Sequence, residues 1–113
     1  MARRLVWSPE SLKDAEAIAG YIASDSIYYA RKVVLRLIST AESIPDNPQS
    51  GRVVPEIGDG NYRERFVHKF RLIYRTEPER IVILAIIHGS RQLEPHANGL
   101  RNLMSEEAPV YQI

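Results

Sequence analysis

The chain has 113 residues, no cysteine and a formal net charge of +1. This length suits a single domain with its own core, and the lack of cysteine excludes disulfides, thiolate zinc sites and thiol nucleophiles. The longest apolar run, Ile81 to Ile87, is far too short to span a bilayer, and no signal-peptide pattern precedes Pro9, so we expect a cytoplasmic protein without a membrane segment.

The first half of the chain predicts a strand followed by a helical hairpin. Residues 3–7 have the character of a short strand, and Ser8 and Pro9 then supply an N-cap and a first helical position. Apolar residues recur at helical spacing over residues 9–23 and again over residues 27–44. The joint between these two helices is so short that they must pack antiparallel.

Each predicted helix has an apolar side for the core and a polar side for water. On the first helix, charged side chains such as Asp14 are expected to face water. The main apolar stripe of the second helix is expected to contain Ile27, Ala30, Val34, Leu37, Ile38 and Ala41. Tyr29, Val33 and Ile44 add apolar area beside that stripe, so the apolar surface of this helix is wider than one core contact needs.

The second half predicts three strands after a loop, residues 45–60, that is rich in proline and glycine. The strands cover residues 61–67, 70–75 and 80–88 and are joined by short turns. The last strand is apolar on both faces, so it should be central in the sheet. The pattern β-α-α-β-β-β predicts an α+β fold, in which an N-terminal strand precedes an antiparallel helical hairpin packed on a small twisted antiparallel sheet.

The predicted domain ends at residue 91. We expect residues 1–91 to form a single domain, because no repeat or low-complexity segment interrupts them. Residues 92–113 contain Pro95, Gly99 and Pro109, which favour a partly irregular C-terminal tail.

Positive charge is concentrated in the predicted sheet. Residues 61–91 hold seven basic side chains against three acidic ones, a net charge of +4 that leaves −3 for the rest of the chain. Most of these cations are arginines, whose planar guanidinium suits bidentate contacts with anionic groups. Strand alternation puts Arg71 and Arg75 on one side of the sheet, and this is the open side if the helices cover Phe70, Leu72 and Tyr74. The side of Arg63 and Arg65 depends on the hairpin register. We predict a target-binding surface formed by Arg63, Arg65, Arg71, Arg75 and Arg91; the alternative is a solvated sheet face with scattered ion pairs.

A second group of side chains suits proton transfer. His88 stands at the end of the last strand, and histidine is the side chain most often used as a general acid or base. Glu56 can take a proton from a ribose hydroxyl while Arg65 and Arg71 hold the phosphate, which would make a ribonuclease site without metal. Alternatively, His88 is a strand-end residue bonded to the next turn and Glu56 is an ordinary loop acid. The histidines have no metal-ligand spacing and the glycines form no phosphate-binding loop, so no metal or cofactor is expected.

Several motifs, in this order and spacing, resemble the RelE/ParE superfamily of type II toxins, whose members are often labelled plasmid stabilisation proteins. The motifs are Trp7-Ser8-Pro9, Gly51-Arg52, Pro55-Glu56, Arg71-Leu72-Ile73-Tyr74-Arg75 and Ile87-His88-Gly89-Ser90-Arg91. They are spread over most of the chain, from Val6 to Arg91. The resemblance implies a helical hairpin on a twisted antiparallel sheet, which is the fold that periodicity predicts independently.

The resemblance also implies a bacterial toxin of one of two kinds. ParE-like members bind DNA gyrase and stall it on cut DNA, whereas RelE-like members are ribosome-dependent ribonucleases that cleave messenger RNA. This chain lacks the lysine-rich loop of RelE proteins, and the closing histidine of that branch would fall nearer Gly89 than His88. We therefore favour a gyrase-directed toxin that acts by binding and is not an enzyme. The alternative is a messenger RNA endoribonuclease that uses Glu56, Arg65, Arg71 and His88.

A cognate antitoxin protein is the partner that the resemblance implies. The antitoxin would neutralise the toxin in a hetero-oligomer, with an amphipathic segment seated in an apolar groove at Tyr29, Val33 and Ile44. A remaining alternative, from another functional class, is a plain interaction module without toxic effect.

Overall fold

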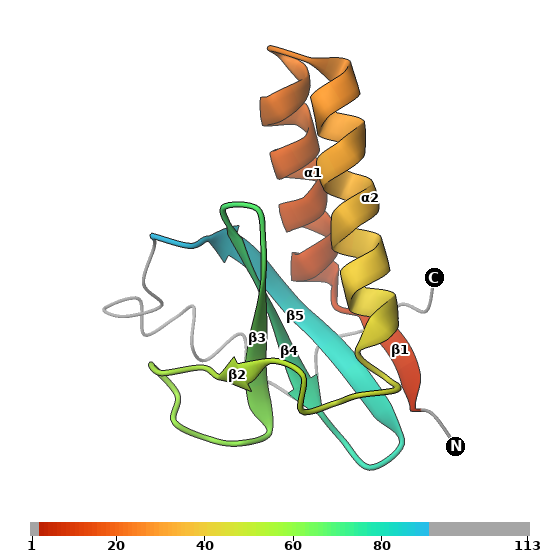
Figure 1. Cartoon of the computed structure of the whole chain (residues 1–113), viewed down its shortest axis with the longest axis vertical. Helices are drawn as coiled ribbons and strands as arrows, with labels where there is room; N and C mark the ends of the chain where they lie inside the picture. Colours follow the sequence, from red (N-terminus) through yellow and green to blue (C-terminus); the bar gives the residue numbers. More distant parts are fainter. Residues whose placement is uncertain (1–2, 91–113) are drawn as a thin grey trace.

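The computed structural model describes residues 3–90, which form two helices and a five-stranded sheet (Figure 1). The elements are β1 (Arg4–Trp7), α1 (Pro9–Ala23), α2 (Ile27–Ser43), β2 (Arg52–Val53), β3 (Tyr62–Val67), β4 (Phe70–Thr76) and β5 (Arg80–His88). The predicted α+β class and the order of its elements are confirmed, with β2 as an additional short strand in the loop before β3. The predicted tail, residues 92–113, lies outside the described residues. Within residues 3–90, neither helix is long and apolar enough to cross a membrane.

The strands lie in the order β1-β5-β4-β3-β2, which confirms the central position of β5. From β5 to β2 the neighbouring strands are antiparallel, but β1 pairs with β5 in parallel, from Arg4 opposite Arg80 to Trp7 opposite Ile83. The sheet is therefore mixed, whereas the sequence predicted a wholly antiparallel one. Alternation of side chains is the same in both directions, so it does not show which way an N-terminal strand runs.

Two polar side chains at the start of α1 fasten the helix to β5. The Ser8 hydroxyl accepts a hydrogen bond from the Ser11 N–H at 3.1 Å and donates one to the Leu84 carbonyl at 3.0 Å. The expectation that Asp14 faces water is wrong, because its Oδ2 accepts a hydrogen bond from the Ile86 N–H at 2.9 Å. That N–H lies on the part of β5 that extends past the end of β1, where a carboxylate can satisfy a strand edge that has no neighbouring strand.

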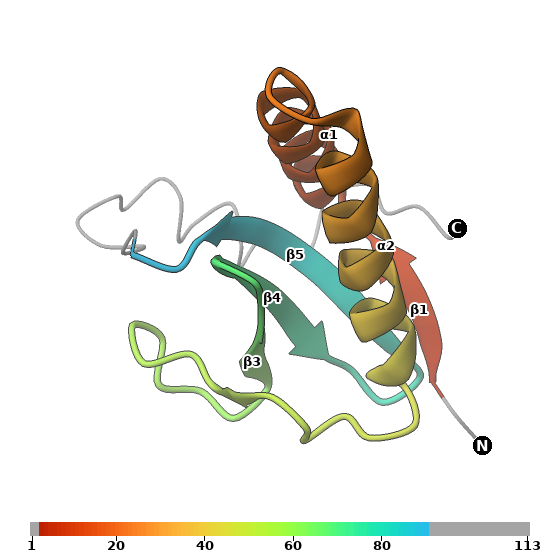
Figure 2. The ribbon, with the colours of Figure 1, turned by 45° about the horizontal axis from the view of Figure 1, so that its top comes forward.

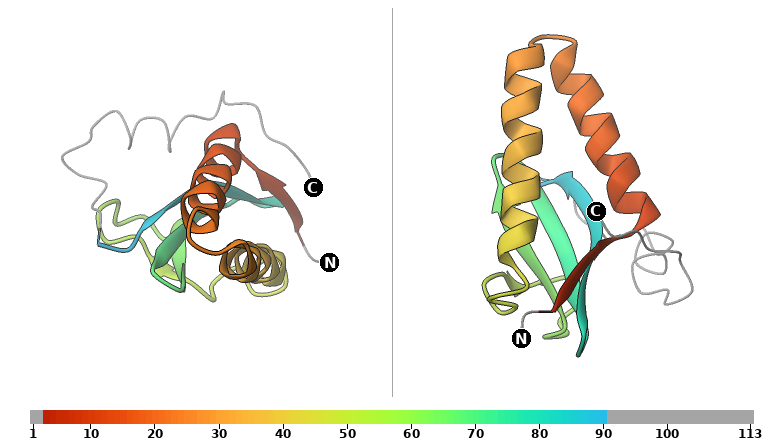
Figure 3. Two further views of the ribbon diagram at one scale, coloured as in Figure 1. Left: turned by 90° about the horizontal axis from the view of Figure 1, so that it is seen from above. Right: turned by 90° about the vertical axis from the view of Figure 1, so that its right-hand side faces the viewer.

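The two helices lie side by side over one face of the sheet (Figures 2 and 3). α1 packs against β5, and α2 packs against β3. The end of the hairpin that carries the α1–α2 turn extends beyond the sheet (Figure 1), and Tyr21, Ile27 and Tyr28 near that end are exposed.

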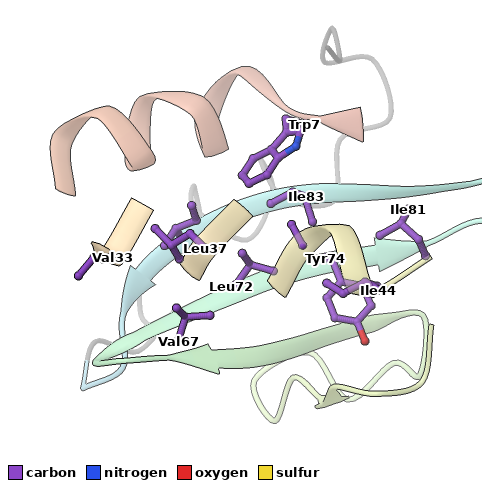
Figure 4. Packing of buried hydrophobic residues seen from close by; sticks show 11 residues of the cluster. Trp7, Val33, Leu37, Ile44, Val67, Leu72, Tyr74, Ile81 and Ile83 are labelled. Atoms are coloured by element: carbon purple, nitrogen blue, oxygen red, sulfur yellow. The ribbon is translucent and has the colours of Figure 1, made fainter. Parts of the chain in front are cut away.

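The main core lies between the helices and the sheet (Figure 4). Val33, Leu37 and Ile44 of the α2 segment pack there with Leu72 and Tyr74 of β4. Buried residues that complete this core are Trp7, Ala41, Val67, Ile81, Ile83 and Ile86. A second cluster occupies the opposite face of the sheet and contains Val6, Val54, Tyr62, Ile73, Val82, Leu84 and Ala85. The sheet is therefore apolar on both faces, which is why the strands read as long apolar runs.

The predicted stripe of α2 is buried at Ala30, Leu37 and Ala41, as expected, but the buried side of the helix is rotated away from its other members. Ile27 and Ile38, predicted within the stripe, are exposed. Val33 and Ile44, predicted beside it, have exposed fractions of 1% and 0%. Where two apolar rows lie next to each other on one helix, periodicity does not choose between them. The choice here follows from the contact of α2 with the sheet.

Tyr74 anchors the loop that follows α2. Its phenolic hydroxyl donates a hydrogen bond to the Pro48 carbonyl at 2.7 Å and accepts one from the Gly51 N–H at 3.0 Å. Gly51 lies so close to β3 that an added Cβ would stand 2.5 Å from the Glu64 carbonyl oxygen and 2.8 Å from the Tyr74 hydroxyl. Glycine is therefore required at this position for close approach of two backbone segments.

We expect Gly51→Ala to lower the free energy of unfolding by about 1–3 kcal/mol, because the extra methyl group must displace backbone or a buried phenol. Gly20→Ala on α1 is the matched control, since nothing lies within 4 Å of an added Cβ there. The control should raise stability by up to about 1 kcal/mol through its helix propensity. Urea unfolding followed by circular dichroism measures both, and a Gly51→Ala protein as stable as the wild type would contradict this packing.

Candidate functional site

Four charged side chains meet on the sheet face opposite the helices. The Arg71 guanidinium donates from Nη1 and Nη2 to the two carboxylate oxygens of Glu56, at 2.8 and 2.7 Å, and from Nε to Oε1 of Glu64 at 2.7 Å. Arg52 donates from Nε to the other oxygen of Glu64 at 2.6 Å. The side chain of Glu64 is 0% exposed and that of Arg71 is 4% exposed. Two cations and two anions thus neutralise one another, with Glu64 and Arg71 removed from water and Arg52 at the exposed rim.

The register of the β3–β4 hairpin brings Glu64 and Arg71 together. Their strands pair so that Glu64 lies opposite Ile73 and Phe66 lies opposite Arg71, which makes the acid and the arginine diagonal neighbours on one face. His68 begins the two-residue turn with φ of 52°, in the left-handed region. A shift of one residue in this turn would move Glu64 to the helix side of the sheet.

The loop between β2 and β3 carries Glu56 to the same place. The Val54 N–H donates to the Tyr62 carbonyl at 2.9 Å, and the Ile57 N–H donates back to the Val54 carbonyl at 3.1 Å. This turn holds Glu56 over the sheet face that bears Arg71. The sequence motif Pro55-Glu56 and the arginine of β4 are therefore joined in space, as a bidentate ion pair.

A second charged cluster closes the turn between β4 and β5. Glu77 accepts hydrogen bonds from Nε of Arg75 at 2.8 Å and from Nε of Arg80 at 2.6 Å. Arg75 is buried on the same sheet face as Arg71. Arg75 and Arg80 both help to hold the strand ends through one shared carboxylate.

These contacts perturb two pKa values. The hydrogen bond to Glu56 is the largest influence on Arg71, and together with Glu64 it raises the pKa of the guanidinium in spite of burial. Burial acts to raise the pKa of Glu77, but the hydrogen bonds from Arg80 and Arg75 outweigh it and lower that pKa below its ordinary value. Both groups therefore keep their charges at neutral pH.

The structure separates the arginines that were predicted to form one target-binding surface. Arg71 and Arg75 lie opposite the helices, as predicted, but both are buried in ion pairs. The register places Arg63 and Arg65 on the other face, the helix side. Arg91 lies outside the described residues. The predicted set therefore does not make one continuous face, because adjacent register positions alternate between the two sides of a sheet.

Arg63 and Arg65 keep their positive charge without a carboxylate in the described part of the chain. Arg63 donates to the carbonyls of Gly60 and Gly51, at 2.9 and 3.0 Å. Arg65 donates to the hydroxyls of Ser43 and Ser50, at 3.3 and 3.2 Å. Both guanidinium groups are partly exposed, so both are open to an outside anion.

The four candidate ribonuclease residues also fall on two faces. Glu56 and Arg71 are paired opposite the helices, whereas Arg65 and His88 lie on the helix side. The His88 ring contacts Phe70 edge to face at 5.9 Å between centroids. Its Nδ1 lies 2.7 Å from the Ser90 hydroxyl and accepts the Ser90 N–H at 3.2 Å. This is the arrangement of a strand-end residue bonded to the following turn.

Sequence reasoning missed Glu64 and Arg52. A signal for Glu64 was present, because strand alternation puts this acid on one face with Tyr62 and Phe66. An acid on a mainly apolar strand face needs a cationic partner once that face is covered. Arg52 carried no such signal, since its place depends on the pairing of β2 with β3.

An apolar groove lies between α2 and β3, but not at the residues predicted for it. Val33 and Ile44 are inside the core, where a partner cannot reach them, and only Tyr29 of that predicted group is exposed. The groove has a volume of about 760 Å³. Its lining consists of Lys32, Leu35, Arg36, Ile38, Ser39, Glu42, Phe66, Val67 and His68. The orientation of α2 explains this change, because it turns Val33 and Ile44 into the core and leaves Leu35 and Ile38 exposed.

Comparisons with known proteins agree with this architecture. A family model described as "ParE toxin of type II toxin-antitoxin system, parDE" matches residues 5–93. A solved structure described as "Chromosomal ParDE TA system from P. aeruginosa" is 20% identical, with a TM-score of 0.64 over 77% of this chain and 96% of that chain. "The structure of YoeB dimer from Staphylococcus aureus" is 18% identical, with a TM-score of 0.55 over 78% and 98%. A search of curated protein sequences finds no significant match.

The fold and the family match define the class of this protein. The fold is shared with the ParDE and YoeB structures, at identities that show the fold alone. The family model is more specific and covers most of the chain. The chain belongs to the ParE toxin family of type II toxin–antitoxin systems.

We expect Glu64→Gln to lower the free energy of unfolding by about 3 kcal/mol, because it removes a buried anion from between two arginines. Glu79→Gln is the matched control, since Glu79 is exposed at a turn and makes no ion pair among residues 3–90. The control should stay within about 0.5 kcal/mol of the wild type. Chemical denaturation measures the difference, and equal stabilities of the two variants would show that the buried pair has no structural role.

Proposed function

We propose that this chain is a toxin that inhibits DNA gyrase by binding to it in the bacterial cytoplasm and that a cognate antitoxin neutralises it. One observation favours a toxin that acts by binding over one that acts by catalysis. Glu56 and Arg71 are engaged with each other on one face of the sheet, while Arg65 and His88 lie on the other. Proton transfer and phosphate binding require groups within reach of one substrate. Membership of the ParE family supports the same choice.

We assign different roles to the predicted target-binding arginines. Arg71 and Arg75 position the sheet, since internal carboxylates neutralise them. Arg63 and Arg65 contact the target, because each keeps a partly exposed guanidinium whose described partners are all neutral oxygens. Arg91 remains a predicted contact beyond the described residues. The ribonuclease alternative requires Glu56 and Arg71 to leave their buried pair, which would uncover charges that are now compensated.

The purified protein should inhibit supercoiling by DNA gyrase and leave ribosome-bound messenger RNA intact. Arg65→Gln should weaken gyrase inhibition about tenfold, because it removes a charged contact. Arg31→Gln on the exposed side of α2 removes the same charge elsewhere and should leave inhibition unchanged. A supercoiling assay and a translation extract measure the two activities. Cleaved message that is lost in an Arg71→Ala protein shown by circular dichroism to be folded would instead establish the ribonuclease, and normal growth on induced expression would leave only an interaction module.

The antitoxin segment occupies the groove between α2 and β3 in this proposal. Leu35 and Ile38 are exposed in the groove and offer apolar anchors for one side of an amphipathic segment. Lys32 and Arg36 line the same groove, so the partner segment should carry acidic residues beside its apolar ones. β2 pairs with β3 only at Arg63 and Glu64. From Arg65 to Val67, the outer edge of β3 therefore has no β2 partner. An added strand fits at that edge.

Ile38→Asp should weaken antitoxin binding at least about tenfold, because it buries a charge against the apolar part of the partner. Ile27→Asp is the matched control, since Ile27 is also exposed on α2 but lies outside the groove. Calorimetric titration of the toxin with the antitoxin encoded beside it measures both affinities, with circular dichroism to confirm folding. Loss of affinity in Ile27→Asp alone would move the antitoxin to the other end of the hairpin.

A further inference from the structure

A polar cavity lies at the end of the sheet remote from the α1–α2 turn. It has a volume of about 260 Å³. Its walls come from three places in the sequence: the start of β1, the loop after α2, and the paired ends of β3 and β4 (Figure 1). The side chains that define it are those of Arg3, Asn47, Gln49, Asn61, Arg63 and Thr76.

The charge of this cavity is not compensated by its walls. Arg3 and Arg63 both line it, and none of its lining residues is acidic. Neither arginine forms an ion pair within residues 3–90. In the same part of the chain, Arg52, Arg71, Arg75 and Arg80 all have carboxylate partners. Two like charges at one cavity repel each other, and a bound anion would relieve that repulsion.

Backbone carbonyls hold both guanidinium groups in place. Arg63 donates from Nε to the Gly60 carbonyl at 2.9 Å and from Nη1 to the Gly51 carbonyl at 3.0 Å. Arg3 donates from Nε to the Glu77 carbonyl at 2.7 Å. A guanidinium has five N–H donors, so each arginine keeps several for a ligand. Because these backbone contacts already orient the two guanidinium groups, binding costs less side-chain entropy than it would for free surface arginines.

Neutral hydrogen-bonding groups complete the cavity. Three amide side chains lie in its walls, and each can donate or accept. Thr76 is also in the wall, and its hydroxyl oxygen is buried without a hydrogen-bond partner in the described structure. That oxygen is not open to the cavity, so the ligand-facing groups are the guanidinium groups and the amides. Planar cations together with amides match the several oxygens of a phosphate ester.

We propose that this cavity is a phosphate-binding site in which Arg3 and Arg63 hold the oxyanion of a phosphate ester. A free nucleotide and the backbone of a nucleic acid both present this group. The proposal shares Arg63 with the suggested target surface, but it does not depend on gyrase as the target. Its test uses phosphate compounds alone, so its failure would leave the gyrase proposal standing.

The test follows the side-chain Nε–H resonances of Arg3 and Arg63 by NMR in the full-length chain. Inorganic phosphate, adenosine monophosphate and a short single-stranded oligonucleotide are titrated in turn, with acetate at matched ionic strength as the reference anion. We expect a saturable shift of both resonances with phosphate compounds and not with acetate. Tighter binding of the oligonucleotide than of the nucleotide would identify a strand as the source of the phosphate, and the reverse would identify a free nucleotide.

Variants separate this site from general attraction of anions. Arg3→Gln and Arg63→Gln should each weaken binding about tenfold, since each removes charge-assisted hydrogen bonds. Arg31→Gln should leave the affinity unchanged. Arg3→Gln remains informative if Arg63→Gln disturbs folding, because Arg3 makes a single backbone contact at the start of β1. No saturable shift with any phosphate probe, an equal response to acetate, or an equal loss in Arg31→Gln would overturn the proposal.

Discussion

The ion pair between Glu64 and Arg71 holds the β3–β4 hairpin, β2 and the following loop in their relative positions. Both side chains are almost wholly removed from water, so neither can lose its partner without leaving a buried charge. Glu64 also holds Arg52, and Arg71 also holds Glu56. The pair therefore ties together the β3–β4 hairpin, the edge strand β2 and the loop that follows it. A change in the register of that hairpin would break all of these contacts at once.

The arginines of β4 have a structural role. The sequence predicted that they would be available to a macromolecular target, but Arg71 and Arg75 form ion pairs with carboxylates of this chain. The raised pKa of Arg71 expresses this, since Glu56 and Glu64 favour its charged form. The buried ion pairs of Arg71 therefore stabilise the fold. Arg63 and Arg65, which have no carboxylate partner among residues 3–90, lie on the helix side.

Three outward features of a ParE-family protein are then distinct in place and chemistry. The groove between α2 and β3 is apolar with basic residues in its lining, and it suits an amphipathic protein segment. Arg65 donates hydrogen bonds to the hydroxyls of Ser43, at the end of α2, and Ser50, in the loop that follows. The polar cavity at Arg3 and Arg63 is smaller and has no acidic lining residue. In the function proposed above, the antitoxin and the target contact different parts of this surface.

The elements themselves followed from local patterns in the sequence. Ser8 and Pro9 begin α1, the apolar residues of β5 make it central, and alternation in β4 puts Arg71 opposite the helices. These features depend on neighbours within a few residues, so the sequence shows them directly. The same patterns did not predict the buried roles of Val33 and Ile44, because periodicity does not show which part of a wide apolar surface the sheet will cover.

The amino-acid sequence thus determined the type and order of the elements, the central strand, the α+β class and the toxin family. Only the tertiary structure decided which arginines form ion pairs with carboxylates and where the groove lies. It also decided that His88 and Glu56 lie on opposite faces of the sheet. The physical reason is that these properties depend on strand register and helix rotation. Both are set by contacts between residues far apart in the chain, above all by the charges that must find partners when the two faces of the sheet are covered.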